Sequence, residues 1–192
     1  MRIGNMIKDK SVAWVPVVVL WCLFLRNAAA TEYAHYPSWT VSQDVLWSLP
    51  NGVLNYLEKS RLKHNYTITS QINPVYQRFD YNGDAKVDYI IYIKNLDNKK
   101  EGFLICESGT KCHILYAGKK IRDASSKSLK FYDNTNGTDF WRVYPARELD
   151  QFPESAPPPT MRWEGIDYGK SESWSVVLYW TGKEFVTYQL SD

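Results

Sequence analysis

The sequence predicts an α+β fold, mainly an antiparallel β-sheet of hairpins with one main N-terminal helix. Residues 50–63 carry apolar side chains at helical spacing, with Val53, Leu57 and Leu62 on one side. Most of the chain after residue 74 alternates short apolar or aromatic segments with turns rich in Gly, Asn and Asp. Because no further helical pattern separates these segments, we expect antiparallel pairing through hairpins rather than parallel crossovers.

The first 30 residues have the features of a secretory signal peptide. Arg2, Lys8 and Lys10 precede an apolar run at residues 12–25, and three alanines at 28–30 supply a small-residue cleavage site. The run of 14 residues spans about 21 Å as a helix, less than the roughly 30 Å of a bilayer core, which argues against an uncleaved anchor. The sequence therefore predicts a signal peptide at 1–30, a single domain at 31–192, a periplasmic or secreted location and no stable membrane anchor after cleavage.

Charge and composition exclude several classes of protein. Lys and Arg number 23 and Asp and Glu 21, so the net charge is +2, and this small excess belongs to the predicted signal peptide. A hydrophobic fraction of 44% and a charged fraction of 23% are typical of a globular chain, not of a disordered tail, a coiled coil or a polytopic membrane protein. The near-neutral charge argues against a nucleic-acid partner.

The strands follow from apolar patterning. Residues 75–80 form one strand, and residues 88–95, which are apolar on both faces, predict a central strand. Residues 140–144 are a further short strand, and residues 173–190 predict a closing hairpin around a Thr-Gly-Lys turn. The polar segment 121–139 and the proline-rich segment 153–160 are expected to be surface loops.

Two cysteines remain once the predicted signal peptide, with Cys22, is removed. Cys106 and Cys112 flank a five-residue turn, Glu-Ser-Gly-Thr-Lys, between two apolar segments. An even pair in an exported chain indicates a disulfide, here across a hairpin and worth about 2 kcal/mol in the chain-entropy model. A redox pair usually has two residues between its cysteines, and a zinc site would need two ligands besides the cysteines, of which His113 could supply only one.

Residues 80–88 carry the one pattern with specific chemistry. Asp80, Asn82, Asp84 and Asp88 place side-chain oxygens at positions 1, 3, 5 and 9, and Lys86 can offer its carbonyl at position 7. Calcium takes six to eight oxygen ligands, and this spacing wraps a short loop around one ion. The alternative is a solvated acidic turn, since Asp, Asn and Gly are also favourable turn residues.

This segment resembles the calcium loops of FG-GAP and VCBS-type proteins, as in the β-propeller repeats of integrin α chains. Those loops run Asp-x-Asp/Asn-Gly-Asp-Gly-x-x-Asp into an apolar strand, here residues 89–91. The resemblance implies ligand roles for Asp80, Asn82, Asp84 and Asp88, with the Lys86 carbonyl, and calcium as the cofactor. The wider order of features is similar to that of small exported bacterial proteins with no assigned activity.

Two departures from the family pattern matter. Ala85 stands where the family has the glycine of the sharp bend, and left-handed geometry there costs an alanine about 1–2 kcal/mol. The chain also holds one copy of the motif, which excludes a propeller built from such repeats.

No enzyme signature is present in the sequence. His35, His64 and His113 are scattered, and nothing resembles a nucleophile elbow, a zinc-protease motif or a phosphate-binding loop. We therefore expect a non-catalytic protein: an exported calcium-binding interaction module of the inhibitor or immunity type, with a protein partner in the cell envelope that is a periplasmic or cell-wall-directed enzyme. Segments 121–139 and 153–160 are its expected contact surface.

Two other functions stay open. A carbohydrate- or peptidoglycan-binding module would use an aromatic platform of Trp163, Tyr168, Trp174 and Trp180. A hydrolase with an unrecognised site is the third hypothesis.

Overall fold

The computed structural model describes residues 43–191, all of which belong to a compact unit spanning Pro37–Asp192. The predicted signal peptide lies outside the described residues. The first sheet contains β1 (Tyr66–Ile68), β2 (Tyr76–Phe79), β3 (Asp88–Asn95), β4 (Glu101–Glu107) and β5 (Lys111–Tyr116). The second sheet contains, in spatial order, β7 (Lys130–Tyr132), β6 (Ile121–Asp123), β11 (Phe185–Ser191), β10 (Trp174–Trp180), β9 (Gly165–Lys170) and β8 (Phe140–Tyr144).

The predicted α+β class is wrong. Strands make up 41% of the structure and helices 11%, and only one helix of the described part of the chain has seven residues or more. The main helix expected over 50–63 is not seen as such, because the segment divides into α3 (Asn51–Lys59) and a 3-10 turn, η1 (Leu62–His64). Helix α2 (Gln43–Ser48) is a short helix before it. The protein is therefore a two-sheet β structure with short helices at its N-terminal side.

Ser60 explains why the helix ends early. Its backbone is extended, with ψ at 157°, and its hydroxyl donates to the Leu57 carbonyl while accepting from the Leu62 amide. A nine-residue helix is marginal by itself in water, so packing must hold it. Val53 and Leu57 are buried against the first sheet, and each contributes about 1.5–3 kcal/mol through burial.

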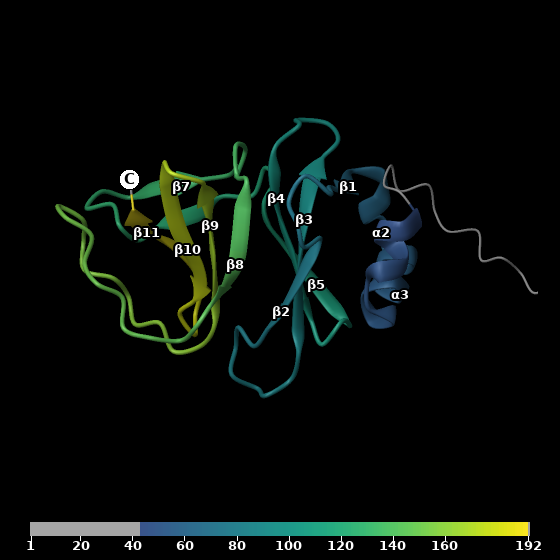
Figure 1. Ribbon diagram of the computed structural model, residues 1–192, viewed down its shortest axis with the longest axis horizontal. Coiled ribbons are helices and arrows are strands. Elements are labelled where there is room, and N and C mark those ends of the chain that lie inside the picture. Colours follow the sequence, from purple (N-terminus) through teal and green to yellow (C-terminus); the bar gives the residue numbers. More distant parts are fainter. Residues whose placement is uncertain (1–42, 192) are drawn as a thin grey trace, which may run out of the picture. The chain divides into compact units, whose positions relative to one another are not determined.

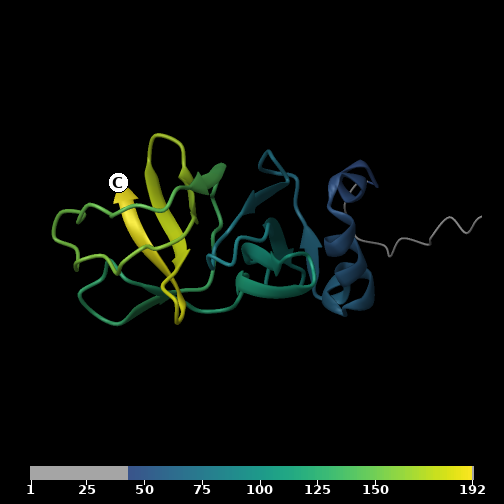
Figure 2. The ribbon, with the colours of Figure 1, turned by 90° about the horizontal axis from the view of Figure 1, so that it is seen from below.

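Three apolar layers hold the unit together, and side-chain alternation along the strands builds them. One face of the first sheet packs on the helices through residues such as Ile91, Ile93 and Leu104. Its other face packs on the second sheet, where Phe103 stacks on Trp141 with ring centroids 5.7 Å apart. Figures 1 and 2 show α2 and α3 on the side of the first sheet that is turned away from β10.

The third layer covers the outer face of the second sheet. Val177, Tyr179 and Val186 point into it from the sheet, and Leu149 and Met161 close it from the long connection between β8 and β9. This connection contains the predicted 153–160 loop, which has no helix or strand.

Several predicted strands are confirmed. β3 lies inside the first sheet with β4 on one side and both β1 and β2 on the other, as its two apolar faces predict. β10 and β11 form the closing hairpin. The 121–139 prediction is wrong in part, because β6 and β7 form there, and β6 pairs with β11 in parallel, an exception to the expected antiparallel pairing.

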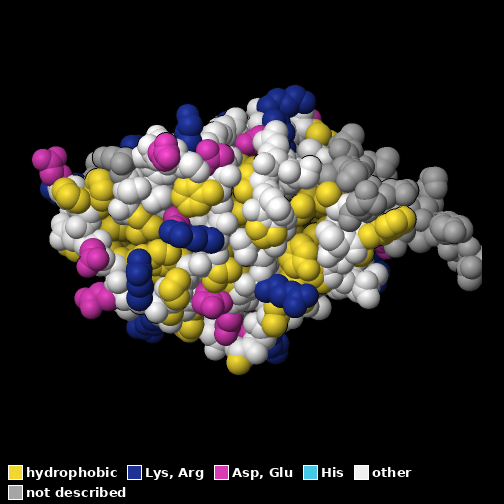
Figure 3. Space-filling model, in the orientation of Figure 1, with side chains coloured by type: hydrophobic (Ala, Val, Ile, Leu, Met, Phe, Trp, Pro, Cys, Tyr) yellow, Lys and Arg dark blue, Asp and Glu magenta, His cyan; other side chains and the backbone are white. Residues whose placement is uncertain are grey.

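The surface gives two further findings. Within the described residues, no helix is long and apolar enough to cross a membrane. On the face shown in Figure 3, basic and acidic side chains are interspersed rather than gathered into a patch of one sign.

Candidate metal centre

Strand register brings the two ends of the 80–88 loop together. β2 and β3 pair in antiparallel fashion, and the pairing begins at Phe79 opposite Asp88. Asp80 therefore leaves the sheet beside the position where Asp88 re-enters it. The seven residues between them, 81–87, must fold back on themselves.

The loop's own polar side chains organise its backbone. The Asp80 carboxylate accepts hydrogen bonds from the Gly83 amide (2.7 Å) and from the Ala85 amide (3.0 Å). Further along, the Asn82 side chain accepts a hydrogen bond from the Asp84 amide, and the Asp84 carboxylate accepts one from the Lys86 amide. These inward-turned oxygens gather the carboxylates on one side of the loop.

Ala85 has the left-handed backbone conformation that the sequence predicts for the bend, with φ at 60°. A left-handed alanine costs about 1–2 kcal/mol, because its Cβ crowds the following carbonyl oxygen. Gly83, at φ 77°, takes a second left-handed position without that cost.

Asp88 is the unusual member of the loop. Its side chain is 0% exposed, its Oδ1 accepts from the Ser108 amide at 2.9 Å, and its Oδ2 has no hydrogen-bond partner among the described residues. Burial raises the pKa of Asp88 to about 6. The Ser108 amide, which donates to Oδ1, and the neighbouring Tyr81 amide, which makes no hydrogen bond of ordinary geometry to Oδ2, oppose this rise in the pKa, and the charges of Asp84 and Asp80 reinforce it. A buried carboxylate oxygen without a partner is destabilising unless a cation or proton compensates it.

Three carboxylates converge at this point. One oxygen from each of Asp80, Asp84 and Asp88 lies within 4.8 Å of the others, so the group could hold a metal ion. The backbone amide of Lys86 is the main cause that lowers the pKa of Asp84 below its usual value, and the Lys86 ammonium lies 3.3 Å from the Asp84 carboxylate. Asn82 and Lys86 belong to the same loop, but ligand roles for the Asn82 amide and the Lys86 carbonyl stay predictions.

Two residues of the connection that leads into β9 support the loop, and the sequence did not indicate them. Glu164, just before β9, accepts from the Asp80 amide at 2.7 Å and donates its own amide to the Asp80 carbonyl. The Trp163 indole lies so close to Gly83 that a Cβ there would overlap its ring nitrogen. No local signal marks these contacts, because they depend on how the two sheets pack.

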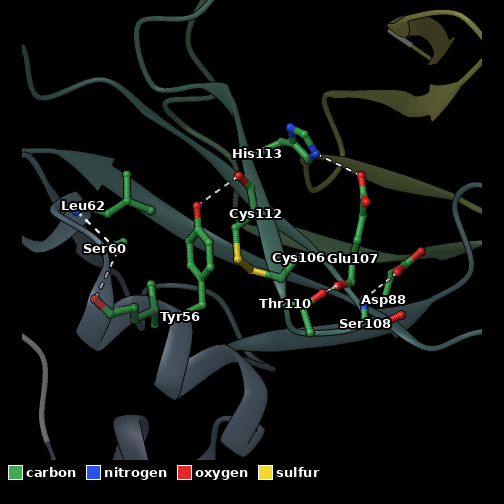
Figure 4. The surroundings of a disulfide bond; sticks show 11 residues. Tyr56, Ser60, Leu62, Asp88, Cys106, Glu107, Ser108, Thr110, Cys112 and His113 are labelled. Carbon is green, nitrogen blue, oxygen red and sulfur yellow. Dashed lines mark hydrogen bonds and ion pairs between the residues drawn. A yellow bond between two sulfur atoms is a disulfide. The ribbon is translucent and has the colours of Figure 1, made fainter.

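The predicted disulfide is confirmed. Cys106 and Cys112 face each other across β4 and β5 with an S–S distance of 2.04 Å. The turn that they enclose carries Ser108, whose amide donates to Asp88, as Figure 4 shows. The disulfide therefore fixes the donor that holds one oxygen of the buried carboxylate.

A second contact joins the same turn to the loop. Glu107 accepts from the Tyr81 hydroxyl at 2.7 Å and lies 2.9 Å from His113 Nε2. The hydrogen bond from Tyr81 is the main cause that lowers the pKa of Glu107, while burial raises the pKa of Tyr81 above its usual value. His113 is thus committed to Glu107 and does not face the three aspartates.

The aromatic platform does not form as one surface. Trp163 covers Gly83, Trp180 packs edge-to-face on Tyr81, and Tyr168 is buried in the core between the sheets. Trp174 is half-buried and lines a cavity on the second sheet. Of the other two histidines, His64 is exposed in η1 and His35 lies outside the described residues.

Comparison of the chain with protein-family models, with curated proteins and with solved structures gave no match.

Proposed function

We propose that this protein is an exported, non-catalytic module that binds calcium in the loop Asp80–Asp88. One observation carries the proposal: the buried Asp88 carboxylate has an oxygen with no partner among the described residues and lies within a group of three convergent aspartates. Burying a carboxylate in this way destabilises the fold, and a connection between two strands can form without it. A bound cation compensates all three negative charges at once.

The donor set favours calcium over zinc. Every side chain turned into the loop offers oxygen, and the closest imidazole to the turn, His113, is paired with Glu107. Zinc sites in proteins are built mainly from cysteine and histidine, whereas calcium takes carboxylate, amide and carbonyl oxygens. The resemblance to FG-GAP loops supports the same ion and adds Asn82 and the Lys86 carbonyl as ligands.

The role of the ion is structural in this proposal. The Asp80 amide donates to Glu164, just before β9, and the Asp88 carboxylate accepts from the Ser108 amide of the disulfide turn. An ion between these two aspartates would therefore connect the β4–β5 turn with the region before β9. The two titratable side chains of the loop that are not proposed ligands are both engaged, Lys86 with Asp84 and Tyr81 with Glu107.

We place the module in an oxidising compartment, periplasmic or secreted, and the Cys106–Cys112 bond is compatible with this location. The proposed partner is an envelope protein, a periplasmic or cell-wall-directed enzyme that the module inhibits. Segment 121–139 supports a protein contact, because Leu129 and Phe131 are 78% and 45% exposed beside the edge of the second sheet.

Terbium luminescence tests the metal site. Tb³⁺ replaces Ca²⁺ at oxygen sites and is excited through a nearby indole, and Trp163 lies against the loop. We expect a luminescence signal that calcium competes away, and an affinity loss of at least about tenfold in Asp84→Asn, because one charged ligand is removed.

Asp97→Asn is the matched control, since Asp97 is an exposed aspartate in the turn between β3 and β4. It should bind terbium and calcium as the wild type does. A wild type without a calcium-sensitive signal, or an Asp84→Asn variant with unchanged affinity, would contradict the proposal.

The partner is tested separately with envelope extract. The mature protein should capture a cell-wall-directed enzyme and lower its activity, and Phe131→Asp should lose both effects while Asp97→Asn retains them. Failure to capture any envelope protein would overturn the partner proposal and leave the metal site unaffected.

A further inference from the structure

A cavity of about 310 Å³ lies on the inner face of the second sheet, where the core between the sheets ends. Asp123, Thr187 and Gln189 form part of its wall from β6 and β11, and Trp174 contributes from β10. Residues 134–136, from the connection between β7 and β8, line it as well.

The sheet face itself changes character along its length. Alternate residues of a strand share one face, so Phe185, Thr187, Gln189 and Ser191 of β11 lie on the same side. Phe185 packs against the core between the sheets, whereas the three polar residues that follow line the cavity. Thr187 and Ser191 also bond within the sheet, to the Arg122 carbonyl and to the Ser175 hydroxyl, so the face turns polar where the core between the sheets ends and the cavity begins.

Asp123 gives the cavity a fixed hydrogen-bond acceptor. It is 8% exposed, and one oxygen of its carboxylate accepts from both the amide and the hydroxyl of Ser125. A carboxylate held in this way keeps its orientation and can accept further bonds from ligand hydroxyls. Gln189 adds an amide on the same wall.

Aromatic rings provide an apolar contact beside these polar groups. The half-buried Trp174 ring is held edge-to-face against the buried Tyr168, with centroids 6.2 Å apart. Tyr132 of β7 lines the cavity as well and is 43% exposed. Both rings are positioned by the sheet rather than by a loop.

A neutral sugar fits this combination of groups. Its hydroxyls match carboxylate and amide partners, and its C–H faces match aromatic rings. None of the residues that line this cavity within the described part of the chain is Lys or Arg, which argues against an anionic ligand. Lys130, whose ammonium lies 4.7 Å from the Tyr132 ring centroid, occupies the position where a cationic ligand would approach that ring.

The site extends beyond one sugar unit. A second cavity of about 490 Å³ shares Asp123, Ser125, Tyr132 and Gln189 with the first, so the two form one groove. The second cavity adds Lys127, Lys130 and Glu154, so with Asp123 the groove carries, among the described residues, two charges of each sign, which still favours a ligand without net charge. We infer that this groove binds a neutral oligosaccharide, with Asp123 as the hydrogen-bond acceptor and Trp174 as the stacking ring. The exposed Leu129 and Phe131 alternate with Lys130 and Tyr132 along the segment, so they lie on the opposite face and leave the groove free.

Tryptophan fluorescence and calorimetry with defined sugars test this inference. The probes are tetrasaccharides of β-1,4-linked glucose, mannose and N-acetylglucosamine, titrated at millimolar concentration into the mature protein. We expect at least one to bind with one-to-one stoichiometry and to change the Trp174 fluorescence. Asp123→Asn and Trp174→Phe should each weaken it by about tenfold or more, because the first replaces a charged acceptor by a neutral one and the second reduces the stacking surface.

Trp47→Phe is the control for Trp174→Phe, since Trp47 is exposed on α2 and should bind sugar as the wild type does. Circular dichroism melts establish that Asp123→Asn and Trp174→Phe are folded, and a variant that is unfolded is replaced by Gln189→Ala, which keeps the sheet. The inference would be overturned if none of the three sugars bound, or if the folded groove variants bound sugar as well as the wild type. It would also be overturned if the protein retained an oligolysine peptide in place of sugar.

Discussion

Two hairpin connections lie against the same tryptophan and are built on opposite principles. In the β2–β3 loop, Gly83 lies against the five-membered ring of the Trp163 indole. In the β10–β11 turn, Gly182 lies near the six-membered ring, and a Cβ built on Gly182 would stand 3.8 Å from the nearest ring carbons. The β10–β11 turn closes with a backbone bond from Thr181 to Glu184. The β2–β3 loop instead closes through the Asp80 side chain, and the Asp88 carboxylate at its far end is buried.

The difference shows what a connection between strands needs and what it does not. At Thr181–Glu184, four residues suffice for the turn, one of them a glycine, and the charged side chains there are exposed to solvent. In the other loop, burial of the Asp88 carboxylate lowers the stability of the fold, and a connection between two strands does not need a buried charge. The extra charge is therefore best explained by a ligand, and the following predictions test this comparison.

Gly83→Ala should show the largest effect. The new Cβ would overlap the Trp163 ring nitrogen and would also sit in left-handed backbone, so we expect a loss of about 3–4 kcal/mol in the free energy of unfolding. Gly182→Ala is the matched variant, with the same backbone strain but ordinary contacts, and should lose about 1 kcal/mol. Urea denaturation measures both, and equal losses would show that Trp163 does not distinguish the two turns.

The pH dependence without calcium should be the next largest effect. The pKa of Asp88 is raised to about 6 in the folded protein, so folding favours the protonated form of this side chain. The stability that Asp88 contributes is therefore fully present below the pKa it has in the unfolded chain, and it is lost as the pH rises through 6. The free energy of unfolding of the wild type in chelator should fall by up to about 3 kcal/mol over that window, relative to Asp88→Asn. Parallel pH profiles for the two proteins would contradict the burial of this charge.

Ala85→Gly should have the smallest effect and the opposite sign. Glycine removes the strain of the left-handed alanine but adds freedom to the unfolded chain, so the free energy of unfolding should rise by roughly 0.5–1 kcal/mol. Differential scanning calorimetry detects this as a higher melting temperature. A lower melting temperature would mean that the alanine methyl group makes a contact that the loop needs.

Much of this region follows from local sequence. The spacing from Asp80 to Asp88 predicted a loop between two strands, and the cysteine spacing predicted the hairpin with its disulfide. Both depend on interactions between residues close in the chain. β3 was predicted for a related reason, since a strand covered on both faces has few polar positions.

The fold class depended on tertiary context and was wrong. The amphipathic pattern over 50–63 received too much weight, because Ser60 ends the helix by bonding its neighbours. β9 was missed because its glycines disfavour a strand, yet a Cβ at Gly165 would stand 2.7 Å from the Leu178 carbonyl. Only the close approach of β10 shows why glycine is required there.

The decisive feature of the site could not be predicted either. Nothing near Asp88 in the sequence shows that its Oδ2 has no partner within residues 43–191, since the residues that bury it come from other strands and from the disulfide turn. The support from Glu164 likewise depends on the packing of the two sheets.

The free energy of unfolding of wild type and Asp88→Asn, each with calcium and with chelator at pH 7, tests the central claim most directly. In chelator the variant should be the more stable, by up to about 3 kcal/mol, because the buried charge is gone and its amide oxygen can still accept from Ser108. Calcium at a hundredfold excess over its dissociation constant should add about 2.7 kcal/mol to the wild type and nothing to the variant. A wild type that does not respond to calcium, together with a variant that is less stable in chelator, would contradict the account.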